Sequence, residues 1–240
     1  FYGYVDAGRF YENSEEVWAL KPLDPATGQP ANYYRATSFT EDAGDIYVVD
    51  LDGDGKITAD GDRTYLGDSN PDMFGGFGTT LYWKGLMANL TFTYSLGGKR
   101  YWVEEASTFG GTNVYNAPNI VLDSWTMKGA GAKYPVVTHY GMGQNSVFTN
   151  RWLHDASYLR LSALNISYRL PQEWFESTLI KVIEATFQAT NLFTITKYPG
   201  MDPQGNFSAT SNMALYGLGS DYSSYPAART FNFGLRFTIN

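Results

Sequence analysis

The sharpest chemical motif in this sequence is a run of three aspartates at alternate positions, Asp50, Asp52 and Asp54. Carboxylates at this spacing can converge on one hard cation, and they repel one another when no cation lies between them. Gly55 follows and permits a sharp turn, after which the carbonyl of Lys56 can supply the next ligand. The run therefore predicts a bound Ca²⁺.

The closing ligand of this loop departs from the usual pattern. The run matches the first part of an EF-hand calcium loop, whose twelfth position is normally a bidentate acid. Here that position is Gly61, flanked by Asp60 and Asp62, so an insertion of one residue lets Asp62 close the site, with Asp60 as the alternative. Residues 47–49 and 65–66 are predicted to be extended, which places the loop outside a true EF-hand. The competing interpretation is an Asp/Gly-rich turn that binds no metal.

Catalytic groups are sparse. Glu104, Glu105 and Asp123 are the acids that could serve a glycoside hydrolase, which needs two carboxylates about 5–10 Å apart across a cleft. His139 and His154 are the only histidines, and neither has a serine or cysteine elbow beside it. Because there are no cysteines, disulfides, thiolate metal sites and thiol nucleophiles are excluded. We expect that the chain is not an enzyme.

The element that best shows how such residues are positioned is the end of the chain, from 230 to 240. Apolar and polar residues alternate there without interruption, which predicts a β-strand with one apolar and one polar face. The apolar set is Phe231, Phe233, Leu235, Phe237 and Ile239, and the polar set is Thr230, Asn232, Gly234, Arg236 and Thr238. The apolar face would pack on a second sheet in a soluble sandwich, or face lipid in an outer-membrane barrel.

Four more strands are predicted upstream. Residues 73–83 and 88–96 form a hairpin around a tight turn at Lys84 and Gly85. Residues 157–170 form a strand whose alternation changes phase, which predicts a β-bulge near Ala163 and Leu164. Residues 183–193 form the fourth. The fold class is therefore all-β.

The connections between these strands alternate in length. Those at 84–85 and 171–179 are short, whereas those at 97–150 and 196–228 are long. Short periplasmic turns and long external loops are typical of outer-membrane barrels. The aspartate loop falls on the long-loop side, which places it outside the cell.

Composition agrees with a membrane sheet and excludes some partners. Charged residues make up only 17% of the chain, below the roughly 25% of soluble domains, and aromatic residues also make up 17%. The net charge of −7 disfavours nucleic acid. No apolar stretch is long enough for a transmembrane helix, but a barrel strand needs only about 9–11 residues. Five strands cannot close a barrel, which needs at least about eight, so we expect a longer parent protein.

Short motifs recur along most of residues 44–240. They are GDI at 44–46, DLDGDGKI at 50–57, DRTYLG at 62–67, LDSWT at 122–126, ASYLRL at 156–161, YRLP at 168–171, NLFT at 191–194, KY at 197–198, Gly200, DP at 202–203, YP at 225–226, RTF at 229–231 and FGL at 233–235. Together these motifs resemble the SusC/RagA family of TonB-dependent outer-membrane transporters. Their order and spacing make the resemblance specific, although the aspartate loop has an extra residue before Asp62 and the chain ends in Asn240 rather than an aromatic residue.

The resemblance implies a 22-stranded barrel with an N-terminal plug, of which residues 1–240 would be roughly the last quarter and 44–66 an extracellular loop. It implies energised uptake of glycans or peptides in the outer membrane of a Gram-negative bacterium of the Bacteroidetes type. The implied partners are a SusD-like surface lipoprotein that acts as a lid, the TonB complex acting on an N-terminal segment, the rest of the barrel and plug, and the lipid bilayer. The lumen-facing candidates for substrate contact are Glu184, Thr186, Gln188, Asn232 and Arg236.

The alternative function is a soluble secreted β-sandwich that binds glycans with the help of calcium. Tyrosine and tryptophan rings would stack on sugars in that protein too, so aromatic content does not separate the two. Partition into detergent micelles would exclude the soluble alternative.

Overall fold

The computed structural model describes residues 1–16, 43–54, 57–109, 118–137, 145, 147–205, 219–222 and 225–239. They belong to two compact units. The sheet unit comprises residues 70–99, 155–205 and 224–240, and the loop unit comprises residues 1–69, 100–154 and 206–223. The five predicted strands all belong to the sheet unit, and most of the predicted long connection 97–150 belongs to the loop unit.

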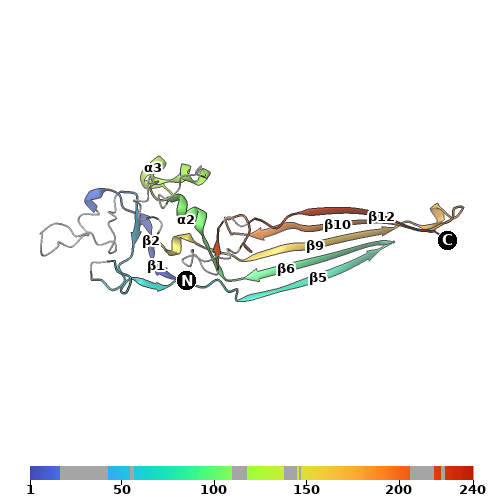
Figure 1. Ribbon diagram of the computed structural model, residues 1–240, viewed down its shortest axis with the longest axis horizontal. Helices are drawn as coiled ribbons and strands as arrows, with labels where there is room; N and C mark the ends of the chain where they lie inside the picture. The colour runs from blue at the N-terminus through green and yellow to red at the C-terminus, as the bar shows by residue number, and fades with distance from the viewer. Residues whose placement is uncertain are drawn as a thin grey trace, which may run out of the picture. The chain divides into compact units, whose positions relative to one another are not determined.

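The sheet unit is a single antiparallel sheet of five strands in the order β12-β10-β9-β6-β5, as Figure 1 shows. The strands are β5 (Met73–Trp83), β6 (Leu86–Leu96), β9 (Tyr158–Arg169), β10 (Ile180–Thr196) and β12 (Thr230–Ile239). The all-β prediction is confirmed, and β10 extends beyond its predicted bounds at both ends. Lys84 and Gly85 join β5 to β6 with φ of 45° and 83°, the positive values that a two-residue hairpin turn requires.

Register keeps the two faces of the sheet chemically distinct from edge to edge. Two adjacent rows of paired residues make this plain. One row is Phe233, Phe187, Ile166, Ala88 and Leu81, and the next is Asn232, Gln188, Asn165, Asn89 and Thr80. The first row belongs to an apolar face on which Phe233 is 81% exposed. Among the described residues, no second sheet covers that face.

The predicted β-bulge lies in β9, one residue earlier than expected. Between Leu161 and Ala163, two consecutive residues of β6 face three of β9, so Ser162 is the extra residue. The insertion returns Leu161 and Leu164 to the same face, as predicted, but puts Ala163 on the polar one. On the other side, β10 is also irregular, and Asn191 there adopts a φ of 50°.

The loop unit contains short strands and helices. The strands are β1 (Tyr2–Tyr4), β2 (Asp6–Phe10), β3 (Ile46–Val48), β4 (Arg63–Tyr65), β7 (Lys99–Trp102), β8 (Leu153–Asp155) and β11 (Ser220–Asp221). The helices are α2 (Val103–Phe109), η1 (Asn119–Asp123), α3 (Trp125–Lys128), η2 (Gly129–Gly131) and η4 (Asn150–Trp152), while η5 (Gln172–Trp174) lies in the sheet unit. None of the described helices is long and apolar enough to cross a membrane.

Pairing in the loop unit is non-local. β1 pairs with β4, and β2 pairs with β3, so the extended flanks predicted for the aspartate loop are confirmed. The sequence patterns predicted no strand at 6–10, where β2 lies. This short strand carries too little alternation to be recognised without its distant partner.

An aromatic stack forms the core of the loop unit. Trp152 and Phe109 are fully buried, with ring centroids 5.9 Å apart and planes 7° apart. Tyr134 stacks on Phe109 at 4.9 Å, and the Trp152 Nε1 donates to the carbonyl of Asn145 at 3.0 Å. The same core includes Ile46 of β3 and Leu66 just after β4, so it anchors both ends of the aspartate loop.

Candidate metal centre and polar face of the sheet

Three of the predicted ligands come together in the aspartate loop. Carboxylate oxygens of Asp50, Asp52 and Asp62 all lie within 4.8 Å of one another, and Asp62 is fully buried. The carboxylate of Asp54 is not part of this group; its backbone amide instead donates to Asp52 at 3.1 Å. The cluster thus brings together three of the five predicted ligands; Asp54 is not among them, and Lys56 lies outside the described residues.

Asp62, rather than Asp60, reaches across the loop. Its two carboxylate oxygens accept the amide protons of Leu51 at 2.8 Å and Thr58 at 2.5 Å. Gly61 occupies the position at which an EF-hand has its closing acid. A Cβ there would lie 2.1 Å from the Oδ2 of Asp52, so a larger residue would require the Asp52 carboxylate to move.

The electrostatics of the cluster favour a cation. The Asp54 amide lowers the pKa of Asp52, but desolvation and repulsion from Asp54 and Asp62 outweigh that bond, so the pKa of Asp52 lies above its ordinary value. Three carboxylates offer only hard oxygen donors, which suit Ca²⁺ better than softer metals. The residues present therefore fit a calcium ion.

The five lumen-facing candidates share the polar face of the sheet. Glu184 is paired with Arg236, Gln188 with Asn232, and Thr186 with Gly234 across β10 and β12. The Arg236 Nη1 lies 3.7 Å from the Glu184 Oε2, and its side chain is largely exposed. The structure also adds members that strand-by-strand patterns did not single out, because the polar row continues through Asn165, Asn89 and Thr80.

A buried ion pair at one end of the sheet was missed by sequence reasoning. Arg160 on β9 and Asp202 are 5% and 6% exposed, with Nη2 donating to Oδ1 at 2.7 Å. The same guanidinium donates to Gln204 at 2.6 Å and to Thr194 at 2.9 Å. The other oxygen of Asp202 accepts the amide of Ala227 at 3.1 Å. This network ties the segments after β10 and before β12 to the sheet.

Two of the candidate catalytic acids have ion-pair partners in the structure. Glu105 is buried in α2, with its Oε2 2.5 Å from the Nε2 of His154. Burial, together with the Glu105 charge and hydrogen bond, raises the pKa of Tyr134 beside it to about 12. Asp123 pairs with Lys128 at the surface. Glu105 and His154 thus pair with each other inside the loop unit, and His139 lies outside the described residues.

Comparison with known proteins now adds to the geometry. No family model matches this chain. The chain is 33% identical over 201 residues to TonB-dependent receptor P3 of Formosa agariphila, which covers 81% of this chain and 19% of that protein. It is 32% identical over 96 residues to the TonB-dependent receptor SusC of Bacteroides thetaiotaomicron, covering 39% of this chain and 8% of SusC.

The structure of the RagAB peptide importer in its open-open state aligns with all of this chain and 22% of its own, with a TM-score of 0.64 and 21% identity. The closed-closed state aligns with a TM-score of 0.63. The fold of the chain is thus found within that importer. This chain is a region of a SusC-like TonB-dependent receptor.

The chain spans about a fifth of the length of the first curated relative. SusC-like receptors are outer-membrane proteins, and this region belongs to one. That location accounts for the uncovered apolar face of the sheet, which a soluble sandwich would bury. The relatives are receptors and transporters rather than enzymes.

The buried Arg160–Asp202 pair gives a stability prediction for the intact SusC-like receptor. We expect Asp202→Leu to lower the free energy of unfolding by about 3–5 kcal/mol, because Arg160 stays buried without its carboxylate. Arg160→Met combined with Asp202→Leu should recover most of the loss. Glu184→Gln, which affects an exposed pair, is the control and should cost less than about 1 kcal/mol. Denaturant unfolding in detergent measures all three, and equal costs for Asp202→Leu and Glu184→Gln would contradict the role of the pair.

The pH dependence of this pair has a definite sign. Burial raises the pKa of Asp202, but the amides of Gln204 and Ala227 and the Arg160 guanidinium outweigh it, so that pKa lies below its ordinary value. Its stabilisation is therefore complete above the unfolded pKa of about 3.9 and is lost as pH falls through the lower folded pKa.

Proposed function

We propose that this chain forms C-terminal strands and extracellular loops of an outer-membrane, TonB-dependent importer of glycans or peptides. One observation supports this above the others: a single sheet carries an uncovered apolar face and, behind it, a continuous polar face. Lipid tails would meet the first face, and the second would line a wet lumen through which the cargo passes.

Strand length agrees with a membrane crossing. β5 and β6 each have 11 residues and β12 has 10, close to the roughly 9–11 that a tilted strand needs. In lipid, every backbone amide must be paired within the protein. The outer edges of β5 and β12 would therefore pair with the rest of a 22-stranded barrel, which a plug fills.

The partners follow from the same assignment. A SusD-like lipoprotein would cover the extracellular side, and the TonB complex would act on the N-terminal part of the receptor. RagAB, a peptide importer with open-open and closed-closed states, supports a lid that opens and closes. The acidic charge of this chain disfavours nucleic acid as cargo. The segment would position and pass its substrate without catalysing a reaction.

We further propose that the aspartate loop binds Ca²⁺ through Asp50, Asp52 and Asp62. Their proximity and the raised pKa of Asp52 both indicate charge that a cation would neutralise. Extracellular calcium sites work at about 10⁻⁴–10⁻³ M, so a partly exposed site of this kind is adequate outside the cell. The ion would fix the loop between β3 and β4. The competing interpretation is an Asp/Gly turn held by the amide bonds of Asp62 alone.

The two faces of β12 should respond differently to charge. We expect Phe233→Arg to lower the stability of the receptor in lipid vesicles by about 2–4 kcal/mol, because arginine would enter hydrocarbon. Asn232→Arg, on the wet face next to it, should cost far less. Heat-modifiability on gels and unfolding in vesicles measure both variants. Equal costs would mean that Phe233 does not face lipid.

Import itself can be tested in cells that express the whole receptor. Uptake of its labelled oligosaccharide or peptide cargo should require the receptor, TonB and an energised inner membrane. A strain that lacks TonB but retains the receptor should bind cargo at the surface without accumulating it. Undiminished accumulation in that strain would exclude the proposed function.

If the loop binds Ca²⁺, substitution of either of two aspartates should weaken binding, and substitution of a third should not. Asp52→Asn and Asp62→Asn should each weaken Ca²⁺ binding by the EGTA-treated receptor at least about tenfold, since each removes a charged ligand. Asp60→Asn, an exposed neighbour outside the cluster, is the matched control. Affinity should also fall as pH is lowered through the raised pKa of Asp52, because protons then compete with the ion. Calorimetric titration measures this, and unchanged binding by Asp52→Asn would remove the calcium proposal.

A further inference from the structure

One exposed aromatic side chain, that of Phe74, lies on the polar face of the sheet rather than on its apolar face. Phe74 is 76% exposed, and its register with Ser95 and Tyr158 puts it on the wet face of β5. Further along this face β5 carries Gly76 and Gly78, then Thr80. Contact with lipid cannot account for Phe74, because the lipid-facing residues have the opposite parity.

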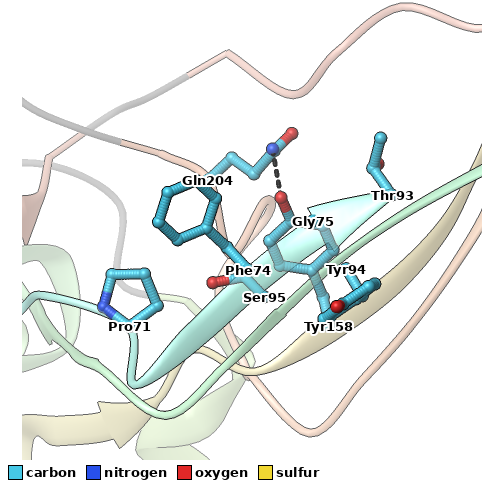
Figure 2. A pocket seen from close by; sticks show the side chains of 8 residues that line it. All are labelled: Pro71, Phe74, Gly75, Thr93, Tyr94, Ser95, Tyr158 and Gln204. Atoms are coloured by element: carbon cyan, nitrogen blue, oxygen red, sulfur yellow. Dashed lines mark hydrogen bonds between the residues drawn. The ribbon is translucent and has the colours of Figure 1, made fainter. Parts of the chain in front are cut away.

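The register leaves a gap between the rings of Phe74 and Tyr158, which we call the slot. Phe74, Ser95 and Tyr158 are paired in one row across three neighbouring strands, so the two aromatic residues are separated by two strand spacings, about 10 Å. The short serine between them leaves a gap. The structure has a cleft of about 480 Å³ here, lined by Pro71, Phe74, Thr93, Ser95, Tyr158 and Gln204 among others, as Figure 2 shows.

Tyr158 forms one wall of the slot, and hydrogen bonds within the protein hold it in place when no ligand is bound. The Gln204 Nε2 donates to the Tyr158 hydroxyl at 2.5 Å, and the Gln204 Oε1 accepts from Arg160 at 2.6 Å (Figure 2 shows the first bond). Arg160 also lies over the Tyr158 ring, 5.5 Å from its centroid. Because Arg160 is itself fixed by Asp202, the Tyr158 ring is preorganised and little conformational entropy is lost on binding.

The lining of the slot selects for a neutral ligand. Its lining includes the hydroxyl-bearing residues Thr93, Tyr94, Ser95 and Tyr158 and the amide of Gln204, and no charged residue is among the residues that line it. Within the described residues, the Ser95 hydroxyl has no hydrogen-bond partner. A pyranose ring has apolar C–H faces for the two aromatic rings and hydroxyl groups around its edge for the polar side chains. A charged peptide would find no free counter-charge on this lining, because Arg160 behind Tyr158 is already paired with Asp202.

We propose that this slot is a binding subsite for one sugar ring of a neutral glycan on its way through the lumen. The inference rests on the proposed import function and selects glycans over peptides as the cargo. Phe74 and Tyr158 stack on the ring, and Ser95, Thr93 and Gln204 bond its hydroxyl groups.

The test uses the whole receptor, purified in detergent, and neutral hexasaccharides of glucose, xylose, mannose and galactose in α and β linkages, with hexaalanine as the peptide probe. Calorimetry should detect binding of at least one hexasaccharide. Phe74→Ala should raise its Kd roughly tenfold, since the apolar contact with a stacking ring is lost, whereas Phe74→Trp should retain the affinity. Tyr82→Ala is the matched control: Tyr82 is 75% exposed, on the same face near the opposite end of β5.

Uptake by cells carrying the same variants separates this inference from the proposed function. Weaker binding and slower uptake of the hexasaccharide in Phe74→Ala, with Tyr82→Ala unchanged, would support the subsite. Unchanged affinity in Phe74→Ala, or TonB-dependent uptake of hexaalanine with no hexasaccharide bound, would overturn the subsite and leave import standing. Cargo uptake that does not depend on TonB would overturn the import function instead.

Discussion

The whole sheet depends on strict agreement between the period of two along each strand and the register between strands. Phe233, Phe187 and Ile166 share a face only because each strand is paired at one particular offset. A slip of one residue in β10 alone would turn its apolar set towards the wet side and its polar set towards lipid. In a membrane this slip would cost free energy at every residue that changes face, so the two-faced pattern and the register reinforce each other.

Two structural features maintain the register where the chain departs from strict alternation. The bulge at Ser162 absorbs the phase change in β9, and its hydroxyl lies 2.6 Å from that of Thr93 on the polar face. The buried Arg160–Asp202 pair then fixes the N-terminal end of β9 against the segment that follows β10. A buried pair of this kind contributes little net stability compared with an apolar substitute, but it fixes one geometry. Here the geometry it fixes includes the wall of the slot beside Phe74.

The loop unit follows a different physical rule. Its strands are three to five residues long in β1 to β4, too short to be stable alone, and they persist because Trp152, Phe109 and Ile46 bury a common core. The aspartate loop is held by that core through β3 and β4, and Asp62 joins it to the buried interior. The cluster at Asp50, Asp52 and Asp62 is thus positioned by packing at its two ends rather than by the helices of an EF-hand.

The sequence alone determined the five strands of the sheet, their faces and the hairpin turn, because alternation and turn chemistry are local properties that neighbouring residues reveal. It also located the aspartate loop and the residues Glu184, Gln188 and Asn232 of the polar face. Tertiary structure decided what depends on distant pairing: that Asp62 joins the cluster while Asp54 does not, that Arg160 meets Asp202, and that Phe74 and Tyr158 flank Ser95. These contacts join residues far apart in the chain, and a period of two fixes the face on which a residue lies but not its neighbour on the next strand.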